Sequence, residues 1–380
     1  QSYTAYALFK SFEGLGTDNE RVCRLLGGTD KKKLFDIASY YVETYGTSLG
    51  ERLKNESSGN FRKATVLWVK GNDPTAGLEY ITDIEVDAED EDAMKNHAKA
   101  LLQERENLRD FVCQVDASDI REACKGLGTN DTQLISIVCG RTKKHLARVD
   151  QYYHSMFNMS LDKQIQKECS GAYETFLRYT LMPEADFDAT MLKKAMDGIG
   201  TNETLIILVL APLTNERMLA ARERHNAKFN TSLMDRLKSE LSGSFEDCVM
   251  ALINGGRDES EEADEYLAVK QAQELHNAGI GKRLGTDKGT FIRILTTASR
   301  AQIQAIRTKY EQNHGMSLEK AVKKECRGDF EKLLLALLMD PINFYAVQLK
   351  EAFKGVLTDT DTVSRILGGN DKVRVVHLLN

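Results

Sequence analysis

The pattern that reveals the architecture of this chain is CKGLGTND at residues 124–131, followed by KECSGAYE at residues 167–174. The same pair returns downstream as MDGIGTNE at residues 196–203 and SELSGSFE at residues 239–246. In both pairs a glutamate follows the second glycine by 40 positions. Because two separate motifs keep one spacing, the sequence predicts an internal repeat, in which each copy is one supersecondary unit.

Three further copies of the glycine motif flank this pair. GLGT stands at residues 14–17, LGT at residues 284–286 and a degenerate GVLT at residues 355–358. Glu56 and Glu325 keep the 40-residue offset, and a Ser-Leu pair follows the second glycine by 32 positions in copies 1 to 4, numbered in chain order. We therefore expect four copies with all of these landmarks and the start of a fifth.

Within each copy the local pattern predicts short helices. In copy 2, apolar residues recur at three- and four-residue steps from Leu146 to Phe157, which is typical of one buried helical face. This helix is expected to end at Asn158, because Asn and Gly adopt the left-handed cap conformation most easily, and Ser160 is expected to cap the next helix. The threonine that closes each glycine motif, Thr129 in copy 2, is expected to be an N-cap as well. Each copy thus indicates about five short helices, and the expected fold class is all-α.

Composition narrows the class of protein. With 42% apolar residues, 28% charged residues and only four prolines among 380 residues, the chain suits a soluble helical protein. Its seven cysteines are odd in number and form no CxxC pair, which favours thiols in a reducing compartment. No apolar stretch is long enough to cross a bilayer, so any membrane contact is expected to be peripheral. A formal net charge of -6 argues against nucleic acid as the main partner.

These motifs resemble those of the annexins, whose five-helix repeats carry KGxGT in one loop and an acidic residue farther along the repeat. The resemblance covers nearly the whole chain outside residues 72–107. It implies right-handed superhelical repeat units packed into a core, calcium (Ca2+) as the cofactor, and an anionic phospholipid membrane surface as the partner. NAGIGKRLGTD at residues 277–287 is similar to the longer loop of the family's third repeat, with one extra residue.

The repeats and the resemblance together divide the chain into six segments. The copies are expected at residues 1–71, 108–184, 185–258, 259–341 and 342–380, the last of them partial, with an acidic linker and its helical tail at residues 72–107. Copies 1 and 5 both resemble a fourth repeat, because RLLGGTDKK at residues 24–32 parallels RILGGNDKV at residues 365–373. Two accounts follow. The chain is either a piece of a longer tandem annexin or a permuted core in which copy 1 fills the fourth position.

The glycine loops are the expected calcium sites. Calcium takes six to eight oxygen ligands, which backbone carbonyls and a bidentate carboxylate can supply. In each copy the expected ligands are therefore the carbonyls of three loop residues and both carboxylate oxygens of the downstream glutamate. The sets are Phe12, Gly14, Gly16 and Glu56 in copy 1; Cys124, Gly126, Gly128 and Glu168 in copy 2; Met196, Gly198, Gly200 and Glu240 in copy 3; and Gly281, Arg283, Gly285 and Glu325 in copy 4.

The net charge explains why calcium would be needed. An acidic protein gains nothing from a negatively charged bilayer, whereas divalent ions bound on one face reverse the local sign. The loop-tip residues Leu15, Leu127, Ile199 and Leu284 either pack beneath their loops or insert at the head-group boundary. We expect a cytoplasmic protein that attaches peripherally to membranes when calcium rises, with self-association there and a cytoskeletal partner left open.

Other function classes fit the sequence less well. GIGKRLG at residues 279–285 lacks the Ser or Thr and the preceding strand of a phosphate-binding P-loop, and the seven histidines are scattered. We therefore expect no enzyme. The main alternative is a calcium-independent helical scaffold for cytoskeletal or other protein partners, against which the intact glycine-glutamate pairs argue.

Overall fold

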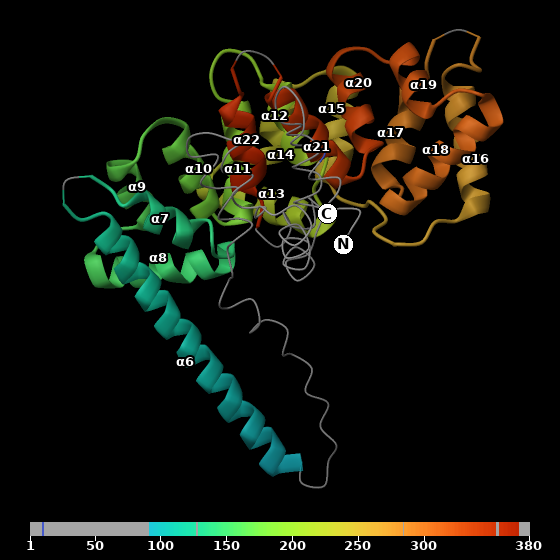
Figure 1. Ribbon diagram of the computed structural model, residues 1–380. Coiled ribbons are helices and arrows are strands. Elements are labelled where there is room, and N and C mark those ends of the chain that lie inside the picture. Colours follow the sequence, from blue (N-terminus) through green and yellow to red (C-terminus); the bar gives the residue numbers. More distant parts are fainter. Residues whose placement is uncertain (1–9, 11–90, 127, 284, 355–356, 372–380) are drawn as a thin grey trace. The chain divides into compact units, whose positions relative to one another are not determined.

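The computed structural model describes residues 10, 91–126, 128–283, 285–354 and 357–371, and within them all long regular elements are α-helices (Figure 1). Seventeen helices, α6 to α22, and no strand occur in these ranges, which confirms the predicted all-α class. None of the helices described is both long and apolar enough to span a membrane. Copy 1 and most of the linker lie outside the described residues.

The helices follow one another with short connections. In chain order they are α6 (Glu91–Ala123), α7 (Asp131–Val138), α8 (Lys143–Phe157), α9 (Leu161–Glu168), α10 (Gly171–Leu181), α11 (Glu184–Ala195), α12 (Glu203–Leu210), α13 (Asn215–Phe229), α14 (Leu233–Glu240), α15 (Gly243–Ile253), α16 (Glu265–Ala278), α17 (Lys288–Thr297), α18 (Arg300–His314), α19 (Leu318–Glu325), α20 (Gly328–Leu337), α21 (Pro341–Ala352) and α22 (Thr360–Gly369). Copies 3 and 4 correspond to α11–α15 and α16–α20, so the expected five helices per copy are present.

The predicted helix ends in copy 2 are confirmed. Helix α8 ends at Asn158, whose φ of 52° is left-handed, and the equivalent residues Asn230 and Gly315 have φ values of 50° and 62°. The side chain of Ser160 accepts a hydrogen bond from the amide of Lys163 and so caps α9. Both features depend only on chemistry within a few residues of the helix end.

The prediction that the loop threonines are N-caps was wrong by one position. The N-cap of each following helix is instead the residue after the threonine. Its side chain accepts a hydrogen bond from the backbone amide three positions later. These N-caps, of α7, α12, α17 and α22, are Asn130, Asn202, Asp287 and Asp359. Asn and Asp cap at least as well as Thr, so the threonine hydroxyl becomes available for another partner. In copy 5 the residue after Thr358, Asp359, caps α22 in the same way.

Helix α6 is longer than a repeat helix because it joins the linker to copy 2. Its 33 residues run from Glu91 to Ala123, so the expected helical tail of the linker and the first helix of copy 2 form one continuous element. No Gly or Pro interrupts this stretch, and the helix ends only where Gly126 approaches. The expected boundary at residue 107 therefore lies inside a helix.

The chain forms two compact units, which are described separately. The first contains the described residues before position 184 and from position 348 onward, and its core includes the fully buried Ile120, Tyr153 and Leu177. In this unit α22 of copy 5 packs closely on α10 of copy 2, where a Cβ on Gly368 would lie 2.9 Å from Cβ of Tyr179. Within this unit copy 5 therefore packs against copy 2.

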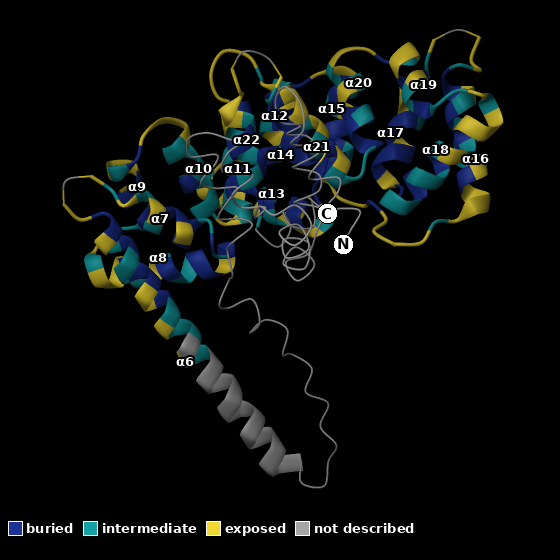
Figure 2. Cartoon of the chain, in the orientation of Figure 1, coloured by how far each residue is buried: buried dark blue, intermediate teal, exposed yellow. Residues whose placement is uncertain are grey.

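The second unit, residues 184–347, surrounds helix α12. All six residues from Leu205 to Leu210 are buried, and α12 packs against α11, α15 and α20. Figure 2 shows this concentration of buried residues on the inner helices, while the loops that join them are largely exposed. A rigid helical framework of this kind holds each glycine loop at the end of a buried helix.

Candidate metal centre

The glycine loops of copies 2, 3 and 4 join the first helix of each copy to the second. Each loop is closed at its base by the same backbone hydrogen bond, in which the amide of the N-cap residue donates to the last residue of the preceding helix. The donor-acceptor pairs are Asn130 to Ala123 at 2.8 Å, Asn202 to Ala195 at 2.7 Å, and Asp287 to Ala278 at 2.8 Å. The loop of copy 5 is closed in the same way, from Asp359 to Ala352 at 2.8 Å.

The loop glycines of copies 2 and 3 are required by backbone conformation. Gly126 and Gly128 have φ values of 92° and 91°, and Gly198 and Gly200 have values of 103° and 84°. A Cβ at any of these four positions would meet no other atom within 4 Å, so space is not the constraint. Only glycine adopts these angles readily, and all four glycines are exposed.

The loop of copy 4 uses two of its glycines differently. A Cβ on Gly279 would lie 2.9 Å from Cγ of Glu325, and a Cβ on Gly281 would lie 2.9 Å from the ring of His276. Neither glycine has a positive φ, so both are needed for close approach. The amide of Gly281 also donates to the carbonyl oxygen of His276 at 2.8 Å, which folds the longer loop back onto α16.

In copies 2, 3 and 4, the fold brings the predicted glutamate to its glycine loop. Glu168, Glu240 and Glu325 are the last residues of α9, α14 and α19, and all three are half-buried. Each carboxylate accepts a hydrogen bond from the loop threonine, which was wrongly predicted to be an N-cap. The three bonds are Thr129 Oγ1 to Glu168 Oε2 at 3.2 Å, Thr201 Oγ1 to Glu240 Oε2 at 3.2 Å, and Thr286 Oγ1 to Glu325 Oε2 at 2.6 Å. The two halves of each predicted site therefore meet in space.

The second carboxylate oxygen has a different neighbour in copies 2 and 3. In copy 2, Gln164 Nε2 donates to Glu168 Oε1 at 3.1 Å. In copy 3, Arg236 Nη2 lies 3.2 Å from Glu240 Oε1 and donates to the carbonyl oxygen of Met196 at 2.8 Å. Sequence reasoning missed both residues, although their position four residues before the glutamate on one helix indicated a contact.

Two buried cysteines flank the loop of copy 2. Burial raises the pKa of the Cys124 thiol to about 11 and that of the Cys169 thiol to about 12. Both thiols are therefore protonated at neutral pH and pack as small apolar groups. The predicted calcium ligand at Cys124 is its backbone carbonyl, not this thiol.

The loop-tip residue of copy 3 settles one of the alternatives left by the sequence. Ile199 has a relative exposure of 109%, so it does not pack beneath its loop. Leu357, in the degenerate loop of copy 5, is also largely exposed, at 85%. Leu15, Leu127 and Leu284 lie outside the described residues, as do the predicted ligands of copy 1, Phe12, Gly14, Gly16 and Glu56.

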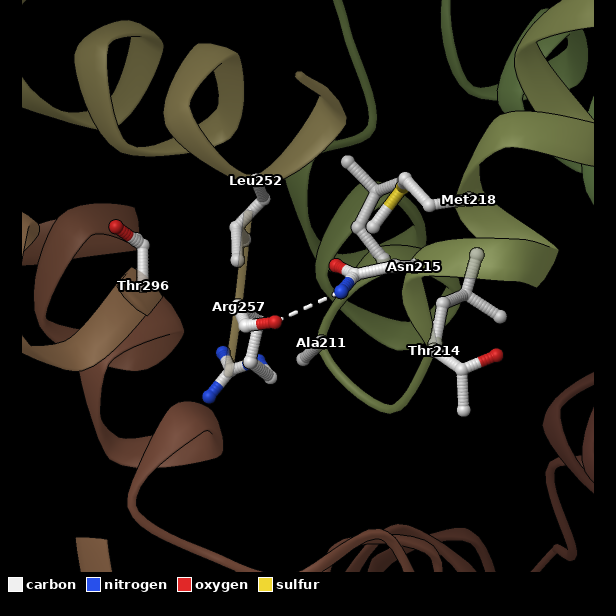
Figure 3. A pocket seen from close by; sticks show the side chains of 9 residues that line it. Ala211, Thr214, Asn215, Met218, Leu252, Arg257 and Thr296 are labelled. Carbon is white, nitrogen blue, oxygen red and sulfur yellow. Dashed lines mark hydrogen bonds between the residues drawn. The ribbon is translucent and has the colours of Figure 1, made fainter. Parts of the chain in front are cut away.

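Figure 3 shows a hollow in the second unit whose lining includes no glycine-loop residue. It is lined by residues that include Ala211, Met218 and Thr296, and its volume of about 10 Å³ suits roughly one water molecule. Asn215 Nδ2 donates to the carbonyl oxygen of Arg257 at 2.8 Å, which is the dashed line in Figure 3. The Arg257 guanidinium donates to the carbonyl oxygens of Ala298 and Leu295 near the end of α17, so this residue links copies 3 and 4.

Comparisons with known proteins agree with this geometry. The sequence profile of the Annexin family matches residues 3–68, 115–179, 187–252 and 270–337. Annexin A6 of Rattus norvegicus is 27% identical over 384 residues, which cover 99% of this chain and 57% of that protein. Annexin A3 of Bos taurus is 35% identical over 280 residues, which cover 72% of this chain and 86% of that protein. The chain thus spans little more than half the length of Annexin A6.

Solved structures give the same result. Annexin III superposes with a TM-score of 0.64 at 34% identity, over 68% of this chain and 80% of that one. Chicken annexin V in complex with Zn2+ gives a TM-score of 0.63 at 32% identity, over 68% of this chain and 82% of that one. Each of the four matched ranges of the profile contains one glycine motif together with its glutamate. By its repeats, its helical fold and these matches, the chain belongs to the annexin family.

Proposed function

We propose that this chain binds anionic phospholipid membranes in a calcium-dependent manner through its glycine loops. The observation that carries the proposal is the threonine-glutamate hydrogen bond found in copies 2, 3 and 4, because it places a carboxylate beside the glycine loop. A set of neutral carbonyls with one carboxylate suits a hard cation such as calcium. Bound there, calcium would supply the positive charge that attracts phosphate and carboxylate groups of lipids.

The ligand sets are those that the sequence predicts. In copy 2 the carbonyls of Cys124, Gly126 and Gly128 would act with Glu168, and the other copies would use the equivalent residues. Three carbonyls and one bidentate carboxylate leave coordination positions for water or lipid oxygens. In copy 4 the exposed Lys282 and Arg283 add positive charge beside the loop, where a lipid phosphate would approach.

The charge of the protein supports a need for calcium. At a formal net charge of -6, the chain is repelled by an anionic bilayer unless cations are bound on the membrane-facing loops. The exposed Ile199 adds an apolar group at a loop tip, where it would insert at the head-group boundary. The attachment we propose is peripheral, reversible and cytoplasmic, and no catalytic role is part of it.

Vesicle cosedimentation tests the proposal directly. The full chain is mixed with phosphatidylserine-containing vesicles or with neutral phosphatidylcholine vesicles, each with calcium or with a chelator, and then pelleted. We expect pelleting with the anionic vesicles in calcium and release when chelator is added. Equal pelleting with and without calcium would favour the calcium-independent scaffold, and the proposal would then be wrong.

A further inference from the structure

One of the three described loops contains a cationic side chain between its predicted ligands. Arg236 Nη2 donates to the carbonyl oxygen of Met196 at 2.8 Å and lies 3.2 Å from Glu240 Oε1. The other carboxylate oxygen of Glu240 accepts the hydroxyl of Thr201 at 3.2 Å. Both carboxylate oxygens and one carbonyl of the copy 3 site are therefore engaged by groups of the protein itself.

The equivalent position differs in the other two copies. Arg236 is four residues before Glu240, and the residues four before Glu168 and Glu325 are Gln164 and Ala321. Gln164 is neutral, and its amide nitrogen donates to the carboxylate of Glu168. Ala321 is fully buried and brings no polar side-chain atom to the loop. The three loops thus share one backbone design but have a cation, an amide or a methyl group at this point.

We infer that Arg236 is a built-in competitor of calcium, which gives the loop of copy 3 a higher calcium requirement than a neutral residue would. This inference rests on the function proposed above. The guanidinium must leave the Met196 carbonyl and Glu240 before these oxygens are available to a metal. Metal binding is opposed because Arg236 loses its charge-assisted hydrogen bonds and because its guanidinium and the metal ion are both positively charged.

The exposure of Arg236 makes this exchange physically simple. The side chain is 39% exposed, so its guanidinium can turn into water without any helix moving. Solvent also screens the pair, which keeps the effect moderate. We expect replacement by a neutral residue to lower the calcium Kd of this loop roughly tenfold, equivalent to about 1.4 kcal/mol.

The test isolates copy 3 in the full-length chain. A background variant carries Glu56→Gln, Glu168→Gln and Glu325→Gln, so that Glu240 is the only intact loop glutamate. Into it are introduced Arg236→Gln, which copies the residue of copy 2, or Arg236→Ala, which copies that of copy 4. The matched control is Lys238→Gln, since Lys238 is an exposed cation on the same helix. Calcium binding is measured by titration calorimetry without lipid.

A second readout measures stability instead of the calcium Kd. In chelator, melting temperatures of Arg236→Gln, Glu240→Gln and the double variant form a double-mutant cycle that measures the coupling between these two side chains. We expect coupling in chelator that disappears at saturating calcium in otherwise unaltered protein. A coupling that persists there would mean that the arginine does not leave, and the inference would be wrong.

The outcomes separate the inference from the proposed function. A lower Kd in both Arg236 variants, with Lys238→Gln unchanged, supports the competitor role. An unchanged Kd in the Arg236 variants, together with loss of binding in Glu240→Gln, overturns it and leaves the proposed function intact. Absence of calcium binding by the unaltered chain, with and without lipid, would overturn the proposed function and the inference together.

Discussion

Oγ1 of Thr286 lies 2.6 Å from Oε2 of Glu325, although 39 residues separate the two in the chain. The bond joins the loop before α17 to the last residue of α19, and it is the shortest of the three equivalent bonds. Thr286 Oγ1 also lies 3.3 Å from the backbone carbonyl oxygen of Glu325. The threonine thus fixes the Glu325 carboxylate beside the glycine loop of copy 4.

This relationship predicts a specific effect of Thr286→Val. Valine keeps the shape of the side chain but removes the hydroxyl donor, so Glu325 loses the bond that orients it, at a cost of about 1 kcal/mol. We expect a severalfold higher calcium midpoint for vesicle binding by copy 4. Thr297→Val is the matched control, because that hydroxyl bonds only within α17, to Arg293. A midpoint that shifts equally in both variants would contradict the orienting role.

The glutamates themselves should carry calcium binding with little effect on folding. Glu168→Gln combined with Glu240→Gln keeps side-chain size but removes both charge and bidentate chelation, so the calcium midpoint should rise severalfold. Stability should change by only about 0.5 kcal/mol per site. The buried Leu161→Ala should instead cost about 2 to 5 kcal/mol and leave the midpoint unchanged. Melting temperature and calcium midpoint, measured on all three proteins, distinguish the two roles.

The contact between α10 and α22 predicts that Gly368 cannot be enlarged. In Gly368→Ala the new methyl group would meet Cβ of Tyr179 at 2.9 Å and the carbonyl oxygen of Phe176 at 3.1 Å. Overpacking of this kind typically costs about 1 to 3 kcal/mol. Gly289→Ala is the control, because its nearest atom, Asp287 Oδ1, is 3.4 Å away and alanine favours the helix. Denaturant unfolding should show destabilisation only in the first variant.

The buried thiols should resist alkylation in the folded protein. Burial raises the pKa of Cys113 and Cys326 to about 11 and that of Cys248 to about 12, so almost no thiolate is present at neutral pH. Cys139 is only partly buried and should react first among the six described cysteines. Iodoacetamide labelling followed by peptide mass spectrometry measures the order. Early labelling of Cys248 would show that the second unit opens more readily than its packing indicates.

The stacked histidines beside the copy 4 loop predict a pH dependence of stability. The rings of His276 and His314 stack with centroids 3.9 Å apart, and burial, followed by the neighbouring His276, lowers the pKa of His314 below its usual 6.5. As the pH falls below 6.5, His314 is protonated more readily in the unfolded chain than in the folded one. The contribution of neutral His314 to the free energy of unfolding is therefore full above pH 6.5 and is lost as the pH falls. His314→Gln should therefore show a smaller drop in melting temperature between about pH 7.5 and about pH 5. An equal drop in both proteins would exclude His314 as the cause.

Local chemistry explains why much of the fold was predictable. The ends of α8 and the start of α9 depend on Asn158 and Ser160, and each acts on groups within four residues of itself. The N-cap prediction for Thr129 failed because two adjacent residues could cap the helix. Asn130 takes that role, and Glu168, 39 residues away, takes the threonine hydroxyl. The outcome depends on Glu168, which is distant in sequence, and helix-capping rules consider only neighbouring residues.

Spacing and residue type were sufficient for the repeat, the helical class and the pairing of the glycine loop with a glutamate in copies 2, 3 and 4. These features recur at constant offsets, and repeated units must pack on one another to bury their apolar faces. The folded chain was needed to show that Ile199 is exposed, that α22 packs on α10, and that Arg236 lies between Met196 and Glu240. Each of these features depends on how separate helices and loops pack in three dimensions. The spacing of motifs along the chain does not specify that packing.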